Sequence, residues 1–154
     1  MIEASGLDRI TREYHRRYSK DFHLWAEEIL GVFLWSKQRE ILYSVGHNRR
    51  TAVPSGHAVG KTFTAAVAVL AFLLTNPWSK VITTAPTWPQ VSLQLWTKIN
   101  ALVRRRLPGL AEDPLQTHLR VEEEWFAVGL SPKHAVNFQG FHAPSVLIVL
   151  DEAP

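Results

Sequence analysis

The chain has 154 residues, of which 46% are hydrophobic and 20% are charged. This balance is typical of one globular domain and excludes a disordered chain. A formal charge of +3 permits a nucleic-acid partner without requiring one. The absence of cysteine excludes disulfides, thiolate catalysis and cysteine-ligated zinc. The longest apolar run, residues 63–74, is shorter than the roughly 20 residues of a membrane span, so we expect a buried helix and no membrane partner.

The N-terminal part is expected to be helical. Residues 1–34 are predicted to form a helical arm, although the charged and aromatic residues 1–24 are equally compatible with a frayed tail. Within this part, residues 21–34 have the mixed apolar spacing of a short helix. A clearer helix is predicted to start at Ser36, a possible N-cap, and to end near Gly46.

Two strand–helix units follow. Residues 49–54, "RRTAVP", read as a short strand, and "SGHAVGKT" then turns the chain into a helix over residues 62–75. Residues 80–85, "KVITTA", are predicted to form a second strand. The next helix opens with Thr87 and Gln90 at the spacing of a capping box.

The last third of the chain is predicted to be β-rich. Residues 117–130 alternate in polarity like a β-hairpin, residues 131–144 read as a loop, and residues 146–150, "VLIVL", read as a buried strand. Strands that alternate with helices indicate an α/β fold with a mainly parallel sheet flanked by helices on both faces. We expect residues 35–154 to form this domain.

The stretch "SGHAVGKT" has the composition of a phosphate-binding loop between a strand and a helix. Small residues allow successive backbone N–H groups to face an anion, and a helix N-terminus favours negative charge. Lys61 would contact the β- and γ-phosphates of ATP, and the Thr62 hydroxyl would bind Mg²⁺. The strict motif has glycine at the position of Ser55, and the alternative is a plain strand–turn–helix junction. The candidate nucleotide-binding residues are Ser55, Gly56, His57, Ala58, Val59, Gly60, Lys61 and Thr62.

The stretch "VLIVLDEAP" places two carboxylates directly after an apolar strand. Asp151 would bind Mg²⁺, and Glu152 would orient the water that attacks the γ-phosphate. The alternative is that Asp151 and Glu152 are a solvated acidic pair in a turn after the strand. Because the carboxyl ends of parallel strands meet at one edge of a sheet, both motifs are expected to face one nucleotide.

Five stretches together resemble large-subunit terminases of tailed bacteriophages, the motors that move viral DNA into a capsid. They are "LWSKQREIL", "SGHAVGKT", "VITTAPTWPQVSLQLW", "EWFAVGLS" and "NFQGFHAPSVLIVLDEA", in that order. The resemblance implies a P-loop ATPase fold, with Lys61 and Glu152 catalytic, Thr62 and Asp151 on Mg²⁺, and Gln38 as the residue that recognises adenine. An exposed helix glutamine is the alternative for Gln38.

The same resemblance implies further roles near these motifs. His57 occupies the place of an arginine in many terminases, and differs from the family there because an imidazole is shorter and only partly charged near neutral pH. Trp88 and Gln90 would lie near a DNA-contacting segment, or would simply start a helix. Arg104–Arg106 would complement a helix dipole, or one of them would reach a neighbouring subunit's ATP.

The resemblance also implies partners, an oligomeric state and a location. The partners are double-stranded DNA, a portal and a small terminase subunit; the chain would form a homo-oligomeric ring; and the location is the cytoplasm of the bacterial host. In this family a further central strand and a nuclease domain follow the Asp-Glu motif, so we expect a fragment that is truncated before its last strands. Two alternatives remain open at this point: a helicase-type nucleic-acid-dependent ATPase, and a fragment that only binds nucleotide or self-associates.

Overall fold

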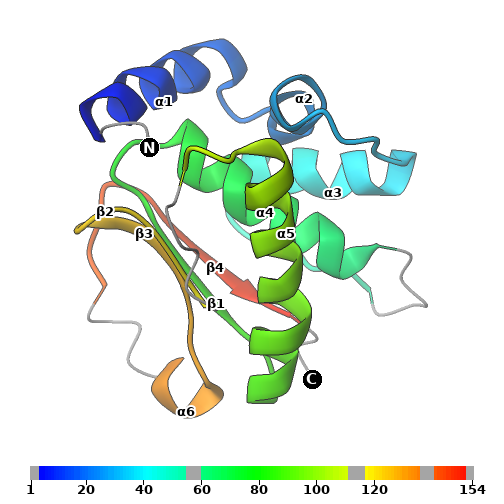
Figure 1. Cartoon of the computed structure of the whole chain (residues 1–154). Coiled ribbons are helices and arrows are strands. Elements are labelled where there is room, and N and C mark those ends of the chain that lie inside the picture. The colour runs from blue at the N-terminus through cyan, green and yellow to red at the C-terminus, as the bar shows by residue number, and fades with distance from the viewer. Residues whose placement is uncertain (1–3, 55–59, 111–116, 136–140, 152–154) are drawn as a thin grey trace.

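The computed structural model describes residues 4–54, 60–110, 117–135 and 141–151, and shows an α/β fold in which helices pack on a four-stranded sheet (Figure 1). The helices are α1 (Ala4–Tyr18), α2 (Phe22–Trp25), the π-helical η1 (Ala26–Leu30), α3 (Ser36–His47), α4 (Lys61–Thr75), the π-helical η2 (Gln90–Leu95), α5 (Trp96–Arg106) and α6 (Pro132–Ala135). The strands are β1 (Lys80–Thr84), β2 (His118–Glu122), β3 (Trp125–Gly129) and β4 (Val146–Leu150).

The sheet is mixed, with the strand order β2-β3-β1-β4. Strand β1 lies between β3 and β4 and is parallel to both. Strands β2 and β3 form the predicted antiparallel pair, which is joined by a short turn at Glu123 and Glu124. The sheet is therefore parallel around its centre and antiparallel at one side.

The main hydrophobic core lies between the helices and one face of the sheet. Alternate strand residues belong to it, among them Val81, Leu119, Trp125 and Ala127, together with most of α4. The apolar side chains of α4 are buried almost all round, as the long apolar run predicts. On the opposite face of the sheet, the ring of Phe141 packs against Phe126. Phe141 belongs to a loop, so at this point a loop covers the face where we expected a second layer of helices.

Strand β4 forms where it is predicted but is not the fully buried strand that its apolar sequence indicates. It lies at the edge of the described sheet. Val146, Ile148 and Leu150 are 40%, 44% and 57% exposed, whereas Leu147 and Val149 pack against the core. An apolar strand is buried on both faces only when layers pack on both sides of the sheet, and among the described residues the helical core covers only the face that carries Leu147 and Val149.

The strand predicted over residues 49–54 is wrong for the part of the chain described. Residues 51–54 have no regular secondary structure, and Ala52, Val53 and Pro54 are exposed. A strand requires a partner for its backbone groups, and Pro54 has no N–H to contribute to a ladder. The hydroxyls of Ser44 and Thr51 lie 2.9 Å apart and connect this segment to α3 instead.

The N-terminal segment is helical and belongs to the same core as the sheet domain. Leu7, Tyr18 and Trp25 are buried within that core. Two polar contacts attach α1 to the end of α4 and the residues after it: the Trp78 indole donates to Asp8 over 3.0 Å, and a ring nitrogen of His15 lies 2.9 Å from the carbonyl oxygen of Thr75, the last residue of α4. Of the two alternatives for this segment, the structure therefore shows the helix. None of the described helices has both the length and the apolar character needed to cross a membrane.

Candidate phosphate-binding site

The site is organised around the start of α4. Gly60 precedes the helix with a φ of 76°, a left-handed conformation that glycine adopts without strain. Its carbonyl oxygen accepts hydrogen bonds from the Thr64 backbone N–H (2.8 Å) and from the Thr64 hydroxyl (2.7 Å). The helix thus begins immediately after Gly60, and the N–H groups of its first turn, including those of Lys61 and Thr62, are the ones that an α-helix leaves without intrahelical acceptors.

Asp151 marks the second component of the site. It directly follows β4, is 9% exposed, and its backbone N–H donates to the carbonyl oxygen of Thr84 over 2.9 Å. This bond continues the pairing of β4 with β1 by one residue beyond the strand. Asp151 therefore lies at the carboxyl ends of two adjacent parallel strands, as predicted.

The fold brings these two components to the same end of the sheet. Four residues join the end of α4 at Thr75 to the start of β1 at Lys80, so the chain reverses and α4 runs antiparallel to β1. The first turn of α4 therefore lies towards the end of the sheet at which β1 and β4 finish. Helix α4 also contacts β4 directly, and Figure 1 shows β4 pointing towards the end at which α4 begins.

Gln38 also reaches this region, from α3. It is a buried residue, and its Nε2 atom lies 3.5 Å from the Gly60 carbonyl oxygen. Its Oε1 atom accepts the backbone N–H of Trp35 over 2.9 Å. Trp35, rather than the predicted Ser36, occupies the N-cap position of α3, and the amide of Gln38 supplies the cap. The alternative of an exposed helix glutamine is therefore wrong.

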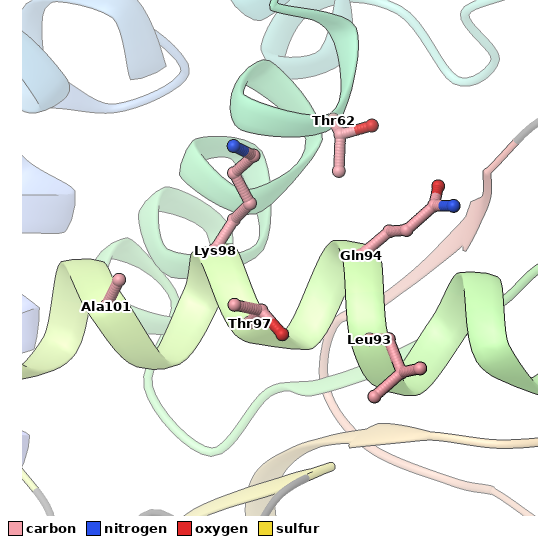
Figure 2. A pocket seen from close by; sticks show the side chains of 6 residues that line it. All are labelled: Thr62, Leu93, Gln94, Thr97, Lys98 and Ala101. Carbon is pink, nitrogen blue, oxygen red and sulfur yellow. The ribbon is translucent and has the colours of Figure 1, made fainter.

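A groove of about 380 Å³ adjoins the first turn of α4. Figure 2 shows its lining: Thr62 comes from α4, whereas Gln94, Thr97 and Lys98, together with the apolar Leu93 and Ala101, come from η2 and α5. None of the described acidic side chains forms an ion pair with Lys98. The groove therefore places an ammonium, an amide and a hydroxyl beside Thr62, a set of groups suited to a polar or anionic ligand.

The basic cluster Arg104–Arg106 lies elsewhere. It occupies the last turn of α5, and Arg106 lines a different pocket together with Leu74, near the end of α4. Twelve helical residues separate Leu74 from Thr62, which corresponds to roughly 18 Å along the helix axis. These arginines accordingly do not belong to the described part of the site at Lys61.

The helix start at Thr87 has the predicted capping geometry. The Thr87 backbone N–H donates to Gln90 Oε1 over 3.0 Å, and the Gln90 backbone N–H donates to the Thr87 hydroxyl over 3.4 Å. Trp88 is 42% exposed on the same turn. The sequence did not single out Lys98, because an exposed lysine within a helix carries no local signal of function.

Several predicted site residues lie outside the described part of the chain. They are Ser55, Gly56, His57, Ala58, Val59 and Glu152. Among the residues that are described, no group of three or more histidine, cysteine or acidic side chains is arranged to hold a metal ion.

Comparisons of the chain with protein-family models, with curated proteins and with solved structures found no match.

Proposed function

We propose that the chain is the ATPase part of a viral DNA-packaging terminase, in which Mg²⁺-dependent hydrolysis of ATP is coupled, in the intact protein, to the movement of double-stranded DNA. One observation carries the proposal: the first turn of α4, with Lys61 and Thr62, and the carboxylate of Asp151 after β4 lie at the same end of the sheet. A triphosphate needs positive charge and free N–H groups on one side and a metal-binding carboxylate on the other, and this end of the fold supplies both.

In this proposal the residues at the start of α4 bind the phosphates. The backbone N–H groups of the first helical turn donate to phosphate oxygens, and the positive end of the helix dipole favours the negative charge. The Lys61 ammonium adds charge-assisted hydrogen bonds to the β- and γ-phosphates. These contacts would hold the γ-phosphate in the position required for attack by water.

The oxygen atoms in the site suit Mg²⁺, which prefers hydroxyl, carboxylate and water ligands. Thr62 and Asp151 would hold the ion, and it would supply positive charge at the phosphate oxygens. Asp151 suits this role because it directly follows β4 and its backbone N–H is fixed by the hydrogen bond to the Thr84 carbonyl oxygen. Glu152 would orient the attacking water.

Nucleotide binding is the first test. Titration with ATP and Mg²⁺ should show binding by the wild type and a loss of about 10- to 100-fold in affinity for Lys61→Ala, since hydrogen bonds to charged groups contribute about 1.5–3 kcal/mol each. Lys37→Ala is the matched control, because Lys37 is an exposed lysine, 87% accessible, that pairs with Glu40. Equal affinities for the wild type and Lys61→Ala would contradict the proposal.

Hydrolysis is the second test. Glu152→Gln should abolish turnover while ATP binding is kept, and Asp151→Asn should raise the Mg²⁺ concentration that binding requires. Stimulation by double-stranded DNA supports the terminase function, whereas stimulation by single-stranded DNA alone favours the helicase-type alternative. Binding without turnover, with or without DNA, would restrict the function of this chain to nucleotide binding.

A further inference from the structure

Gln38 is the one residue outside α4 and its preceding loop that has a side-chain contact with Gly60 among the described residues. We propose that Gln38 is a positioning residue for the peptide group between Gly60 and Lys61 at the start of α4, and that it acts on the phosphates of any nucleotide rather than by reading the base. This inference rests on the proposed function, because it assumes that the start of α4 binds phosphate.

The amide of Gln38 connects the starts of two helices. Its oxygen accepts the Trp35 backbone N–H over 2.9 Å at the start of α3, and its nitrogen lies 3.5 Å from the Gly60 carbonyl oxygen at the start of α4. Recognition of an adenine edge requires an amide to donate and to accept towards the base at the same time. Here one donor and one acceptor site of the amide are already directed at backbone groups, and the residue is 9% exposed, which limits its access to a base.

Gly60 is fitted closely to this contact. A Cβ atom at position 60 would lie 2.5 Å from Gln38 Nε2, closer than such atoms approach, and the φ of 76° is unfavourable for other residues. The positive φ is what requires glycine here, and a side chain at position 60 would in addition displace the Gln38 amide from its present contact.

The contact adds a third partner that holds the direction of one peptide group. The Gly60 carbonyl accepts from Gln38 as well as from the Thr64 backbone and hydroxyl, so it is held towards the helix and α3. In a trans peptide the C=O and the following N–H point in opposite directions, and no cis peptide is present among the described residues. Holding the Gly60 carbonyl therefore directs the Lys61 N–H away from the helix body, towards the side where a phosphate would bind.

A positioning role and a base-reading role predict different losses of ligand affinity when Gln38 is replaced. If Gln38 orients the Lys61 N–H, removing its donor weakens every ligand that carries the phosphates, including tripolyphosphate, which has no base. If Gln38 reads adenine, the same change affects ATP alone and removes any preference for ATP over GTP. The affinity for ATP relative to the affinities for GTP and tripolyphosphate thus distinguishes the two roles.

The experiment is a set of titrations of ATP, GTP and tripolyphosphate, each with Mg²⁺, into the full chain and its Gln38→Ala and Gln38→Glu variants. The carboxylate of Gln38→Glu still accepts the Trp35 N–H but offers no donor to Gly60. We expect both variants to lose about 3- to 10-fold in affinity for all three ligands, the effect of one hydrogen bond, with an unchanged ATP-to-GTP ratio. Wild-type ligand affinities in Gln38→Glu would overturn the proposal. They would show that Gln38 contributes to binding only through its cap on α3, which the glutamate keeps.

Asn76→Ala is the matched control. The Asn76 side-chain amide donates to the Phe72 carbonyl over 3.0 Å at the far end of α4, so this variant loses the same kind of bond on the same helix without affecting Gly60. Its ligand affinities should equal those of the wild type, and circular dichroism should show that all variants are folded.

Two further results would overturn the positioning role while leaving the proposed function intact. One is a loss of ATP affinity in Gln38→Ala with unchanged tripolyphosphate affinity, and the other is no loss for any ligand. If the wild type binds none of the three ligands, the proposed function fails, and the positioning role fails with it.

Discussion

The indole N–H of Trp96 donates to the hydroxyl oxygen of Thr83 over 2.8 Å, in the buried interface between α5 and the sheet. The same hydroxyl donates to the Val128 carbonyl oxygen over 3.2 Å, so one oxygen atom connects α5, β1 and β3. Gly129 leaves the space that this arrangement needs, because a Cβ atom there would lie 2.6 Å from Trp96 Nε1. This connection holds α5 against the strand pair near the end of the sheet that carries the candidate site.

Replacing Thr83 with valine should destabilise the fold by about 1–3 kcal/mol, because the buried Trp96 N–H would lose its acceptor. Equilibrium unfolding in urea measures this loss. Thr84→Val is the control, since the Thr84 hydroxyl donates to the Leu130 carbonyl and accepts from no buried donor of the described residues. Equal losses in the two variants would show that the Trp96–Thr83 bond makes no separate contribution.

Gly46→Ala should destabilise the protein although it replaces glycine with the best helix former. In an open helix this change raises stability by about 0.5–1 kcal/mol. Here the new Cβ atom would lie 1.9 Å from the backbone carbonyl oxygen of Lys20, which cannot move aside like a flexible side chain. We expect a net loss of about 1–3 kcal/mol in urea unfolding, the usual cost of overpacking. An increase in stability would show that the segment containing Lys20 is not packed against α3; Glu40→Ala, at an exposed position of α3, is the neutral control.

His118 should make stability depend on pH. Burial, with a smaller contribution from Arg120, lowers the pKa of His118 below its usual 6.5. The folded state therefore favours the neutral ring, and the stabilisation is complete above about pH 6.5 and declines as the pH falls from there towards the folded pKa. Thermal unfolding between pH 5 and 8 should show a smaller loss on acidification for His118→Gln than for the wild type. Identical pH profiles would contradict this assignment.

The edge of β4 should promote self-association. Among the described strands β4 pairs with β1 alone, and the exposed apolar side chains of Val146, Ile148 and Leu150 lie on the sheet face that adjoins its other edge. Ile148→Lys should therefore reduce the proportion of oligomer in sedimentation velocity runs over a range of concentrations. Phe33→Lys, which changes an 80% exposed side chain away from the sheet, is the matched control. If both variants behave alike, the edge is not the associating surface.

Lys98 should contribute modestly to phosphate binding, provided that the proposed function holds. It projects into the groove beside Thr62 from an exposed position, where screened charges contribute about 0.2–1 kcal/mol. Lys98→Ala should weaken tripolyphosphate binding by about 1.5- to 5-fold, and the difference should shrink as salt is added. A variant that binds like the wild type at low salt would exclude Lys98 from the site.

Features that depend on neighbouring residues could be predicted from the sequence. The apolar run after Lys61 predicted α4, the spacing of Thr87 and Gln90 predicted a capping box, and the polarity alternation after Thr117 predicted an antiparallel pair. The placement of Asp151 at the carboxyl end of a parallel strand also followed, because the order of helices and strands restricts how the chain can return to the sheet.

What the sequence determined by itself is therefore the kind and approximate extent of the strongly patterned elements, such as α4, β1 and the β2–β3 pair, since caps and periodicity act over three or four positions. Only the tertiary structure decided that β4 lies at an edge, that residues 51–54 have no strand partner, and that Gln38 contacts Gly60 across 22 positions of sequence. These outcomes depend on which distant backbone and side-chain groups find one another as the core packs, and no local pattern records that choice.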